Sequence, residues 1–478
     1  MVVYCQNMNN SNAYCWGLLA RFAPQAIFLL TTMILARLVN PEAFGTIGVL
    51  AVIFSVANIL LDSGLGGSLI KEKEISDIDC STISIFNIIV SLLIYIILFY
   101  VADYLQSYFN IEGLSSVIRT ISWVFPISAF GIVPLSLLKR RLLFNKIFIC
   151  SISGVIVASF SAVIVALCDG DVYALVTYQI VVNAVNVILY FYFSDYKLSF
   201  KFSYVSLRRL IPFGFFTSVV TIVDTVYENI MTVLTGKYLD IKTAGYLYQA
   251  KRLEESTSTS MSVAVGVVAF PILTRIKEDL EAFRVECKKT YDTITLLLFP
   301  ILTLVSVFSK DIINILFGKQ WIPSAAYLKI LMICGLFIMT EQLMLSFIKA
   351  LGKVKNLMYL TLVKRTIGLT LLICCLLLDP TMLIYGYLSA TIIGCCFNIY
   401  LFAKVSNSEV SHTFMLLARN LIMPFLFVFI CKTISVFING GYIYMIGISL
   451  VFLSLYYTTY LKHRGINIVS FVKNTLRQ

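Results

Sequence analysis

Apolar runs of about 20 residues recur from one end of the chain to the other. Such a run is the length that a helix needs to cross a hydrocarbon core about 30 Å thick. Only 13% of the 478 residues are charged, whereas a soluble domain keeps roughly a quarter. Barrel strands would be alternating segments of roughly ten residues, and these runs do not alternate. The sequence therefore predicts an all-α polytopic membrane protein.

The runs divide into about fourteen candidate transmembrane helices separated by short polar breaks. The N-terminal stretch MVVYCQNMNNSNAYCW has no basic region and no A-x-A site, so we expect no cleaved signal peptide. We expect the spans near residues 14–36, 43–62, 80–101, 114–138, 147–167, 172–193, 208–235, 244–270, 290–309, 325–348, 357–378, 382–403, 414–431 and 441–461.

Lysine and arginine are distributed very unevenly between alternate loops. One side holds dense clusters, at 139–146, 197–209 and 275–289 among others, and also the basic C-terminal tail. The positive-inside rule places this side, and with it both termini, in the cytoplasm. We expect a protein of the bacterial inner membrane. The net charge of +12 is thus a topology signal, and it implies no nucleic-acid partner. The other side holds only Arg37, Lys237, Lys242, Lys310, Lys319 and Lys432.

The cysteines and histidines do not have the spacing of a metal site. The chain has 12 cysteines and two histidines, and no C-x-x-C occurs. The adjacent pairs Cys374-Cys375 and Cys395-Cys396 lie inside apolar runs. We interpret the cysteines as small, buried, free thiols. We expect no metal and no cofactor, with a proton or sodium gradient as the candidate energy source.

Two polar loops far apart in the chain follow the same pattern. ARLVNPEAFGTIG, 36–48, matches GKYLDIKTAGYLY, 236–248, with Gly45 opposite Gly245. The helices before these loops also begin alike, with RFAP and RLIP. Later in each half, Arg119, Ser136 and Lys139 are matched at a constant spacing by Lys329, Ser346 and Lys349.

These matches predict two duplicated six-helix lobes, because each match relates two helices whose positions in the order of spans differ by six. An even number of helices gives both copies the same membrane orientation, which implies a pseudo-twofold axis along the membrane normal. We expect an N-terminal lobe at 1–193, a cytoplasmic linker at 194–207 and a second lobe at 208–403. Two additional helices and a tail would occupy 404–478. The polar stretch 194–209 is the candidate hinge.

Helical spacing places several polar residues of the spans on common faces. Thr217, Thr221, Asp224 and Glu228 form one stripe on the seventh span. Lys251, Glu255, Ser258 and Ser262 form a second stripe on the eighth span, and the first two spans carry Arg21, Gln25, Thr32, Ser55, Asn58 and Asp62. Two lobes that meet along these faces would enclose a polar cavity with charges of both signs.

Each of these ionisable residues has a structural explanation as well as a functional one. Arg21 and the pair Lys364-Arg365 lie close enough to the ends of their spans for the charged groups to reach the interface between membrane and water. Short acidic side chains cannot do so, which favours functional roles for Asp224, Glu228 and Glu341. The structural alternative for the first two is an ion pair with Lys251.

The quoted stretches resemble polysaccharide flippases of the Wzx type, within the multidrug/oligosaccharidyl-lipid/polysaccharide exporter superfamily. The similarity starts with LLARFAPQAIFLLTTMILARLVNPEAFGTIGVLAV and LLDSGLGGSLIKEKEIS. It continues with VLTGKYLDIKTAGYLYQAKRLEES, VVAFPILTRIKEDLEAFR and ILFGKQWIPSAAYLKIL. The resemblance covers about residues 14–400, and beyond that only hydropathy supports it.

This resemblance implies a two-lobed transporter without enzyme activity. It would move undecaprenyl-pyrophosphate-linked oligosaccharides from the cytoplasmic to the periplasmic leaflet by alternating access, for O-antigen, capsule or exopolysaccharide synthesis. Candidate partners are the lipid-linked oligosaccharide, the bilayer, and the polysaccharide polymerase with its chain-length machinery. The candidate substrate-binding residues are Arg21, Gln25, Lys251, Arg252, Lys364 and Arg365. The candidate ion-coupling residues, inferred from the spacing, are Asp62, Asp224, Glu228, Glu255 and Glu341.

Two other functions were weighed against the flippase. A multidrug exporter of the same fold is one alternative, but cationic cavity residues would repel cationic drugs. A membrane polymerase or glycosyltransferase is the other, and it would need a large outer loop with catalytic groups. The largest candidate loop, SKDIINILFGKQWIPSA at 309–325, has a single acidic residue and no histidine.

Overall fold

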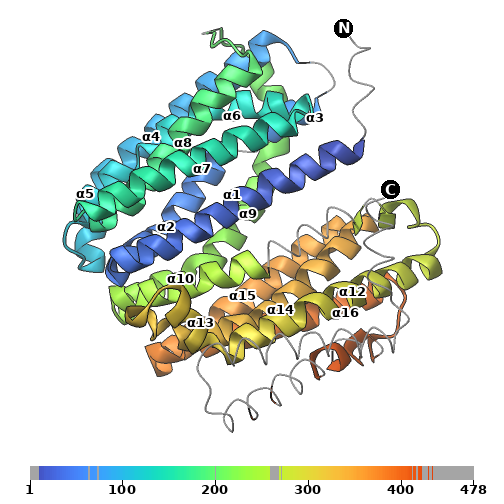
Figure 1. Cartoon of the computed structure of the whole chain (residues 1–478). Helices are drawn as coiled ribbons and strands as arrows, with labels where there is room; N and C mark the ends of the chain where they lie inside the picture. Colours follow the sequence, from blue (N-terminus) through green and yellow to red (C-terminus); the bar gives the residue numbers. More distant parts are fainter. Residues whose placement is uncertain are drawn as a thin grey trace. The chain divides into compact units, whose positions relative to one another are not determined.

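A computed structural model of the chain is built almost entirely of helices (Figure 1). It divides into two compact units, residues 1–249 and 250–478, and packing is described within each unit. The boundary falls inside helix α10, so this helix starts in the first unit and continues into the second. The structure describes residues 10–62, 65–72, 75–199, 201–258, 269–270, 272–411, 413–415, 418–422, 429 and 433.

The first unit is a bundle of long helices. α7 packs along α8 and α1, α6 packs along α8 and α4, and α9 packs along α2. Its core includes the stacked rings of Phe54 and Phe125, whose centroids are 5.3 Å apart. The elements are α1 (Asn10–Leu38), α2 (Pro41–Asp62), α3 (Leu65–Lys71), α4 (Asp77–Phe109), α5 (Leu114–Ile121), α6 (Val124–Arg140), α7 (Phe144–Leu167), α8 (Asp171–Ser194), α9 (Tyr204–Tyr238) and the first half of α10 (Ile241–Thr257).

Local sequence explains where several of these helices begin. Pro41 is the first residue of α2, a position where its missing N–H costs nothing. Ser76 caps α4 through a capping box with Asp79, which satisfies two backbone donors at that end. The predicted span at 114–138 is instead divided into α5 and α6. The break lies just before Pro126, which has no N–H to donate to the carbonyl of Ser122.

The second unit has the same kind of architecture. α14 packs between α12 and α16, and α15 packs along α16. The outer loop predicted at 309–325 folds into two short helices, and Trp321 is fully buried beside Phe317. The elements after α10 are α12 (Leu280–Val307), α13 (Ser309–Leu316), η2 (Lys319–Trp321), α14 (Ser324–Ala350), α15 (Val354–Leu378), η3 (Pro380–Met382), α16 (Leu383–Val405) and an apolar helical segment at Thr413–Ile422.

Helix boundaries recur in the two halves of the chain as the sequence repeat predicts. The first helix of each half is followed after two residues by the next one. α2 begins at residue 41 and α10 at 241, α6 ends at 140 and α14 at 350, and α7 begins at 144 and α15 at 354. The all-α polytopic class with duplicated halves is confirmed. Most of the two C-terminal spans predicted at 414–431 and 441–461 lies outside the described residues.

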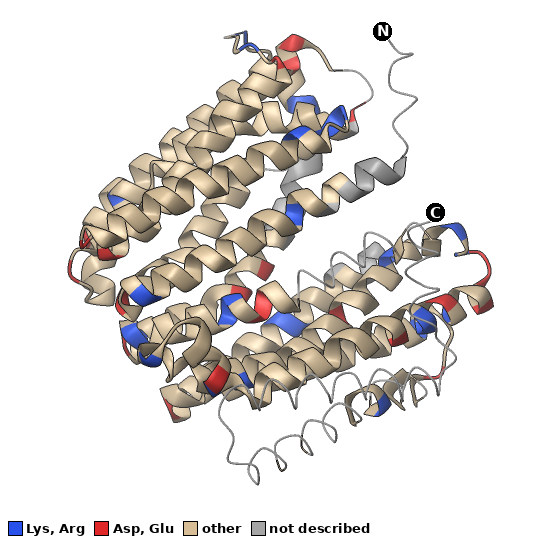
Figure 2. Cartoon of the chain, in the orientation of Figure 1, with Lys and Arg blue, Asp and Glu red and all other residues tan. Residues whose placement is uncertain are grey.

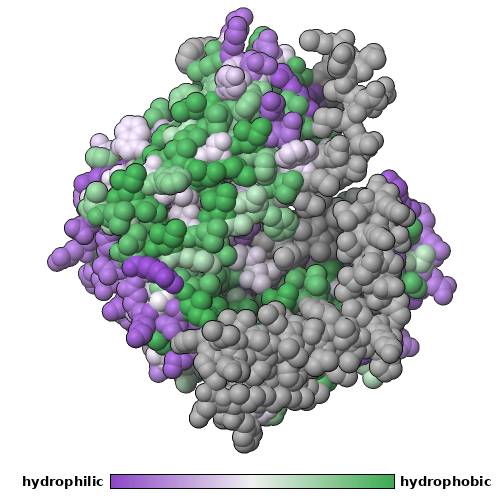
Figure 3. Space-filling view, viewed as in Figure 1, coloured by the Kyte–Doolittle hydropathy of each residue, from purple (hydrophilic) through white to green (hydrophobic). Residues whose placement is uncertain are grey.

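The outer surface of the helices is apolar where a lipid-facing surface should be. Large side chains such as Tyr100, Phe160 and Ile188 are well exposed on α4, α7 and α8. On the face shown in Figure 3, hydrophobic residues cover the middle of the first unit. Charged residues of that unit gather at the helix ends (Figure 2). Ten helices among the described residues are long and apolar enough to cross a membrane, so the chain is a multi-pass membrane protein.

The linker predicted as a hinge is attached to the first unit by its backbone. The hydroxyl of Ser81 on α4 donates to the carbonyl of Ser199 and accepts from the N–H of Lys201 at 3.0 Å. The next hydroxyl, of Thr82, accepts from the N–H of Ser203 at 3.0 Å. Two successive residues of α4 thus hold alternate residues of the linker, 199, 201 and 203.

Side chains strengthen this attachment. Arg209 forms a 2.9 Å ion pair with the buried carboxylate of Asp79 at the start of α4. The hydroxyls of Tyr196 and Ser84 lie 3.0 Å apart. Burial raises the pKa of Tyr196, so the phenol stays neutral at physiological pH. The segment at 194–209 is therefore an integral part of the first unit.

Candidate functional site

The two matching loops are brought together by their glycines. A Cβ atom on Gly45 of α2 would lie 1.9 Å from the carbonyl oxygen of Ile241, at the start of α10. A Cβ atom on Gly245 would lie 1.9 Å from the carbonyl oxygen of Pro41. Each would be 3.0 Å from the other glycine's nitrogen. The first turns of α2 and α10 thus cross with their backbones in contact, at a point that only glycine permits.

Further small residues keep the same helices close. A Cβ on Gly48 would lie 2.9 Å from the Cβ of Tyr248, and one on Gly236 would lie 2.4 Å from Val49. Close approach through glycines is the usual way in which membrane helices pack without a hydrophobic driving force. The resulting glycine crossing, Gly45 with Gly245, is a tight joint inside the first unit next to the helix that runs on into the second.

The candidate polar residues of the first unit differ in exposure. Arg21 and Glu228 are exposed, and Gln25 and Asp224 are half-buried. Arg21 and Gln25 lie one helical turn apart on α1, and Asp224 and Glu228 lie one turn apart on α9, as the spacing predicts. The side chain of Asp62, at the end of α2, lies outside the described part of the structure.

On α10, the part that belongs to the second unit carries four charged residues in sequence. The ammonium of Lys251 is buried, and its Nζ lies 3.6 Å from Oε1 of Glu255, an exposed acid one turn later. Arg252 is half-buried. Glu254 is 2% exposed and accepts a hydrogen bond from Ser258. A Cβ on Gly335 of α14 would lie 3.1 Å from its carboxylate, so this glycine makes room for it.

Glu341 and Lys364, predicted for separate roles, form one buried ion pair. Nζ of Lys364 on α15 donates to Oε1 of Glu341 on α14, and the two side chains are 4% and 10% exposed. α16 covers the pair at Gly394, where a Cβ would lie 3.3 Å from the carboxylate. The next residue, Arg365, is half-buried on another face of α15. The pairing neutralises two charges that would each be costly at this depth.

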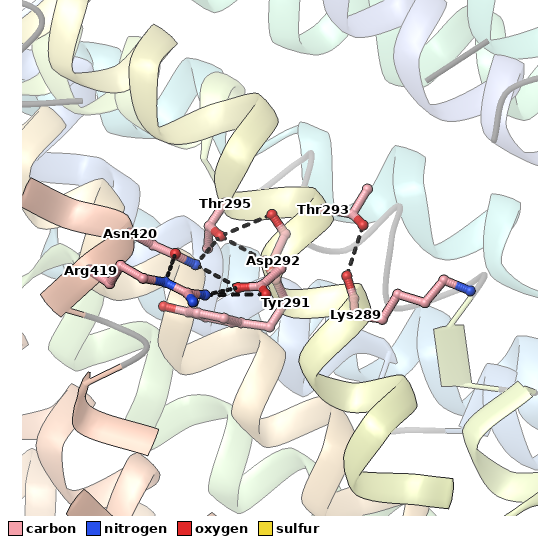
Figure 4. A network of polar contacts seen from close by, with 7 residues as sticks. All are labelled: Lys289, Tyr291, Asp292, Thr293, Thr295, Arg419 and Asn420. Carbon is pink, nitrogen blue, oxygen red and sulfur yellow. Dashed lines mark hydrogen bonds and ion pairs between the residues drawn. The ribbon is translucent and has the colours of Figure 1, made fainter. Parts of the chain in front are cut away.

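A second polar network in this unit joins α12 to the segment 413–422 (Figure 4). The carboxylate of Asp292 accepts two hydrogen bonds from Arg419, at 3.2 and 3.3 Å. The amide of Asn420 donates to Asp292 at 3.0 Å and to Thr295 at 2.8 Å. The neighbouring hydroxyls of Tyr291 and Thr340 lie 3.3 Å apart. The network fixes the start of the thirteenth predicted span on the second unit.

The sequence-based selection of residues missed Glu254, Asp292 and Arg419. Arg419 lay inside a predicted span and Asp292 near the end of one, so ionisable character at membrane depth was the available signal. Glu254 is next to the predicted Glu255, but it points toward α14 and not along the predicted stripe. The nine cysteines whose side chains the structure describes are free thiols, as predicted, but burial was predicted wrongly for four of them: Cys168 and Cys374 are exposed, and Cys375 and Cys396 are half-buried.

The second unit thus holds one buried ion pair and one partly buried ion network, and the first holds the glycine crossing and a polar stripe on α9. Comparison with known proteins identifies the family to which the chain belongs. The family model described as polysaccharide biosynthesis protein matches residues 34–326. Lipopolysaccharide biosynthesis protein WzxC of Escherichia coli (strain K12) is 26% identical over 67% of this chain and 66% of its own length. Succinoglycan biosynthesis transport protein ExoT of Rhizobium meliloti (strain 1021) is 24% identical over 64% of this chain and 62% of its own length.

The chain therefore spans about two thirds or less of the length of these two curated relatives. Among solved structures, the lipid II flippase MurJ in an inward closed conformation is similar with a TM-score of 0.74. It is 14% identical, and the alignment covers 94% of this chain and 99% of MurJ, which supports the fold. Since the family model covers more than half of the residues, the chain belongs to the polysaccharide biosynthesis protein family of membrane proteins.

Proposed function

We propose that the protein is a flippase that moves polyprenyl-pyrophosphate-linked oligosaccharides across the cytoplasmic membrane for surface polysaccharide synthesis. The observation that carries this proposal is the family match over residues 34–326. The names of WzxC and ExoT, a lipopolysaccharide and a succinoglycan protein, support a role in exporting surface glycans. The MurJ-like fold supports transport of a lipid-linked substrate without covalent chemistry.

The charged residues inside the spans suit a substrate of this kind. The polyprenyl tail can remain in lipid, while the pyrophosphate and the sugars need a polar passage. Guanidinium and ammonium groups form charge-assisted hydrogen bonds with pyrophosphate oxygens. We assign this role to Arg21, Lys251 and Arg252, with Gln25 near the sugars and Arg365 as an additional cation. Lys364 supports the substrate path indirectly, through its pair with Glu341.

Location and partners belong to the same proposal. The loop charges support a bacterial inner membrane location with both termini in the cytoplasm. The polysaccharide polymerase and chain-length machinery would receive the product on the periplasmic side. No nucleic acid is involved.

Deletion of the gene in its native host tests the function. Lipid-linked repeat units should accumulate on the cytoplasmic side while surface polysaccharide disappears. Unchanged surface polysaccharide, in a host without a second flippase, would refute the proposal. Increased drug sensitivity with normal polysaccharide would instead indicate a multidrug exporter.

Loss of the cations that we assign to pyrophosphate binding should weaken complementation of that deletion strain. We expect Arg21→Ala, Lys251→Ala and Arg252→Ala each to reduce surface polysaccharide about tenfold or more, because one charge-assisted contact contributes about 1.5–3 kcal/mol. Arg37→Ala, in the last turn of α1 and exposed, is the matched control and should complement fully. Normal activity of the triple variant, at normal membrane levels, would rule out the pyrophosphate-binding role.

The acidic residues are the candidates for coupling to an ion gradient. If Asp224 and Glu228 take up an ion during transport, Asp224→Asn and Glu228→Gln should lose the dependence of transport on the gradient while keeping the membrane level of the protein. The measurement is glycolipid translocation in vesicles with and without an imposed proton or sodium gradient. Glu112→Gln, which changes an exposed acid in the turn between α4 and α5, serves as the control and should keep the gradient response. Unchanged gradient responses in the first two variants would mean that these residues are structural.

A further inference from the structure

The second unit contains a cavity that the proposed transport does not use. It has a volume of about 380 Å³, within the range of small-molecule sites. All of its lining residues lie on α12, α14, α16 and the stretch 408–413, so it belongs to one unit. Along α12 it extends from Glu281 to Tyr291, about 15 Å by the helical rise. It is therefore elongated along α12.

The mouth of the cavity carries two cations and two acids. Arg284 and Lys288 lie one turn apart on α12, with Glu281 one turn before them and Glu409 across the opening. Arg284 is held in place because its Nε donates to the carbonyl of Leu280 at 3.0 Å and its Nη1 to that of Asn407 at 3.1 Å. Glu281, Lys288 and Glu409 are exposed, so the mouth opens to the surroundings.

The interior is apolar and ends in a polar floor. The walls are formed by Met344 and Phe347 of α14 and by Ile399 and Phe402 of α16, with the rings of Phe347 and Phe402 at 5.7 Å. The floor is the hydroxyl pair of Tyr291 and Thr340, both buried. Figure 4 shows Tyr291 next to the Asp292–Arg419 network.

This arrangement matches an amphiphile with a zwitterionic head. We propose that the cavity binds one phosphatidylethanolamine-type lipid of the cytoplasmic leaflet. Its phosphate would contact Arg284 and Lys288, and its ammonium would contact Glu281 and Glu409. The first part of an acyl chain would lie between the apolar walls, where each buried CH₂ contributes about 0.8 kcal/mol. The dense positive charge of the loop before α12 places this end of the helix at the cytoplasmic surface.

Mixed charge at the mouth is the reason for choosing this head over an anionic one. Two cations alone would favour phosphatidylglycerol, but the two carboxylates attract the ammonium of phosphatidylethanolamine, whereas phosphatidylglycerol has only a neutral glycerol at that place. The site is independent of whichever glycan the protein carries. A lipid held there would also contact Ser408, Glu409 and Thr413, which lie just before and at the start of the segment that the Asp292 network fixes.

Photolabelling of the purified full-length protein tests the site. The probe is phosphatidylethanolamine with a photoreactive group in its acyl chain, and labelled peptides are identified by mass spectrometry. We expect the label on the α12, α14 and α16 peptides that line the cavity. Unlabelled phosphatidylethanolamine should reduce it about tenfold. The same concentration of phosphatidylglycerol, or of phosphoethanolamine without chains, should reduce it less than twofold.

Variants at the mouth have a close control. Lys288→Gln should lower the labelling about fivefold. The double variant Arg284→Gln with Lys288→Gln should lower it about tenfold. Lys289→Gln removes the neighbouring charge, which pairs with Glu286 outside the cavity, and should change nothing. Glu281→Gln with Glu409→Gln should let phosphatidylglycerol compete as well as phosphatidylethanolamine.

Several outcomes would overturn the proposal. Label spread evenly over the apolar helices would mean ordinary solvation by lipid. Equal competition by phosphatidylglycerol in the unmodified protein would exclude a zwitterionic site, and full competition by phosphoethanolamine would indicate a water-soluble ligand. Loss of labelling in Lys289→Gln would show that general surface charge, not the cavity, attracts the probe.

Discussion

We expect Gly45→Ala to lower the unfolding free energy by about 3 kcal/mol and to abolish polysaccharide complementation. The added methyl group would lie 1.9 Å from the carbonyl oxygen of Ile241, so the backbones of α2 and α10 must separate. Overpacking of this kind costs about 1–3 kcal/mol, and here a rigid backbone atom is the obstacle. Gly245→Ala meets the carbonyl of Pro41 at the same distance and should behave alike.

Gly17→Ala is the matched control, because a Cβ on Gly17 of α1 would meet no heavy atom within 4 Å. In a helix, alanine is intrinsically more favourable than glycine by about 1 kcal/mol, so this variant should be neutral or slightly more stable. The two exchanges thus have opposite signs for the same chemical change. In the double variant Gly45→Ala with Gly245→Ala, the second exchange should lower the unfolding free energy by less than the first, because α2 and α10 have already separated. Thermal unfolding in detergent measures both effects, and equal stability of Gly45→Ala and Gly17→Ala would contradict the crossing.

Glu341→Leu should destabilise the second unit by about 3–5 kcal/mol. The exchange leaves the ammonium of Lys364, whose side chain is 4% exposed, without its carboxylate partner in an apolar region. Lys364→Met should cost a similar amount, because it leaves the carboxylate uncompensated. The double variant Glu341→Leu with Lys364→Met removes both charges and should recover most of the loss, since apolar replacements of buried pairs are often neutral.

A double-mutant cycle on the unfolding free energy measures this coupling. Additive effects of the two single exchanges would show that the two groups do not depend on each other. The cycle also separates structure from transport: a stable double variant that no longer complements the deletion strain would assign the pair a role in the transport cycle. A stable double variant with normal transport would make the pair purely structural.

Much of the fold followed from patterns that are local in the chain. Apolar runs gave the helices, polar breaks gave the loops, and the repeat of Gly45 in Gly245 indicated the duplication. The division of the span at 114–138 depends on how the backbone rearranges before Pro126, which composition does not specify. Helix–helix contacts depend on the rotation of each helix about its axis, and this is set by packing with elements distant in sequence.

In the candidate site, too, the contacts between helices could not be predicted from the sequence. Spacing along α9 and α10 grouped residues on one helix, but it could not show that Glu341 and Lys364 face each other from adjacent helices. Nor could it show that Glu254 turns toward Gly335 while Glu255 stays exposed. Both facts depend on glycines of a neighbouring helix, Gly394 and Gly335, whose effect is to leave space.

The attachment of the linker to α4 also determines the order in which this protein can mature during synthesis. Ser81 is made 118 residues before its partner Ser199. At about 5–20 residues per second, the ribosome needs roughly 6–24 s to bridge that interval. Throughout it, the hydroxyls and the carboxylate at the start of α4 have none of their linker contacts. The first unit is complete only when α9 and the start of α10 have emerged, so translation past residue 249 is the step that seals it. A nascent chain that stalls earlier presents an unfinished helix end, which a protease can recognise.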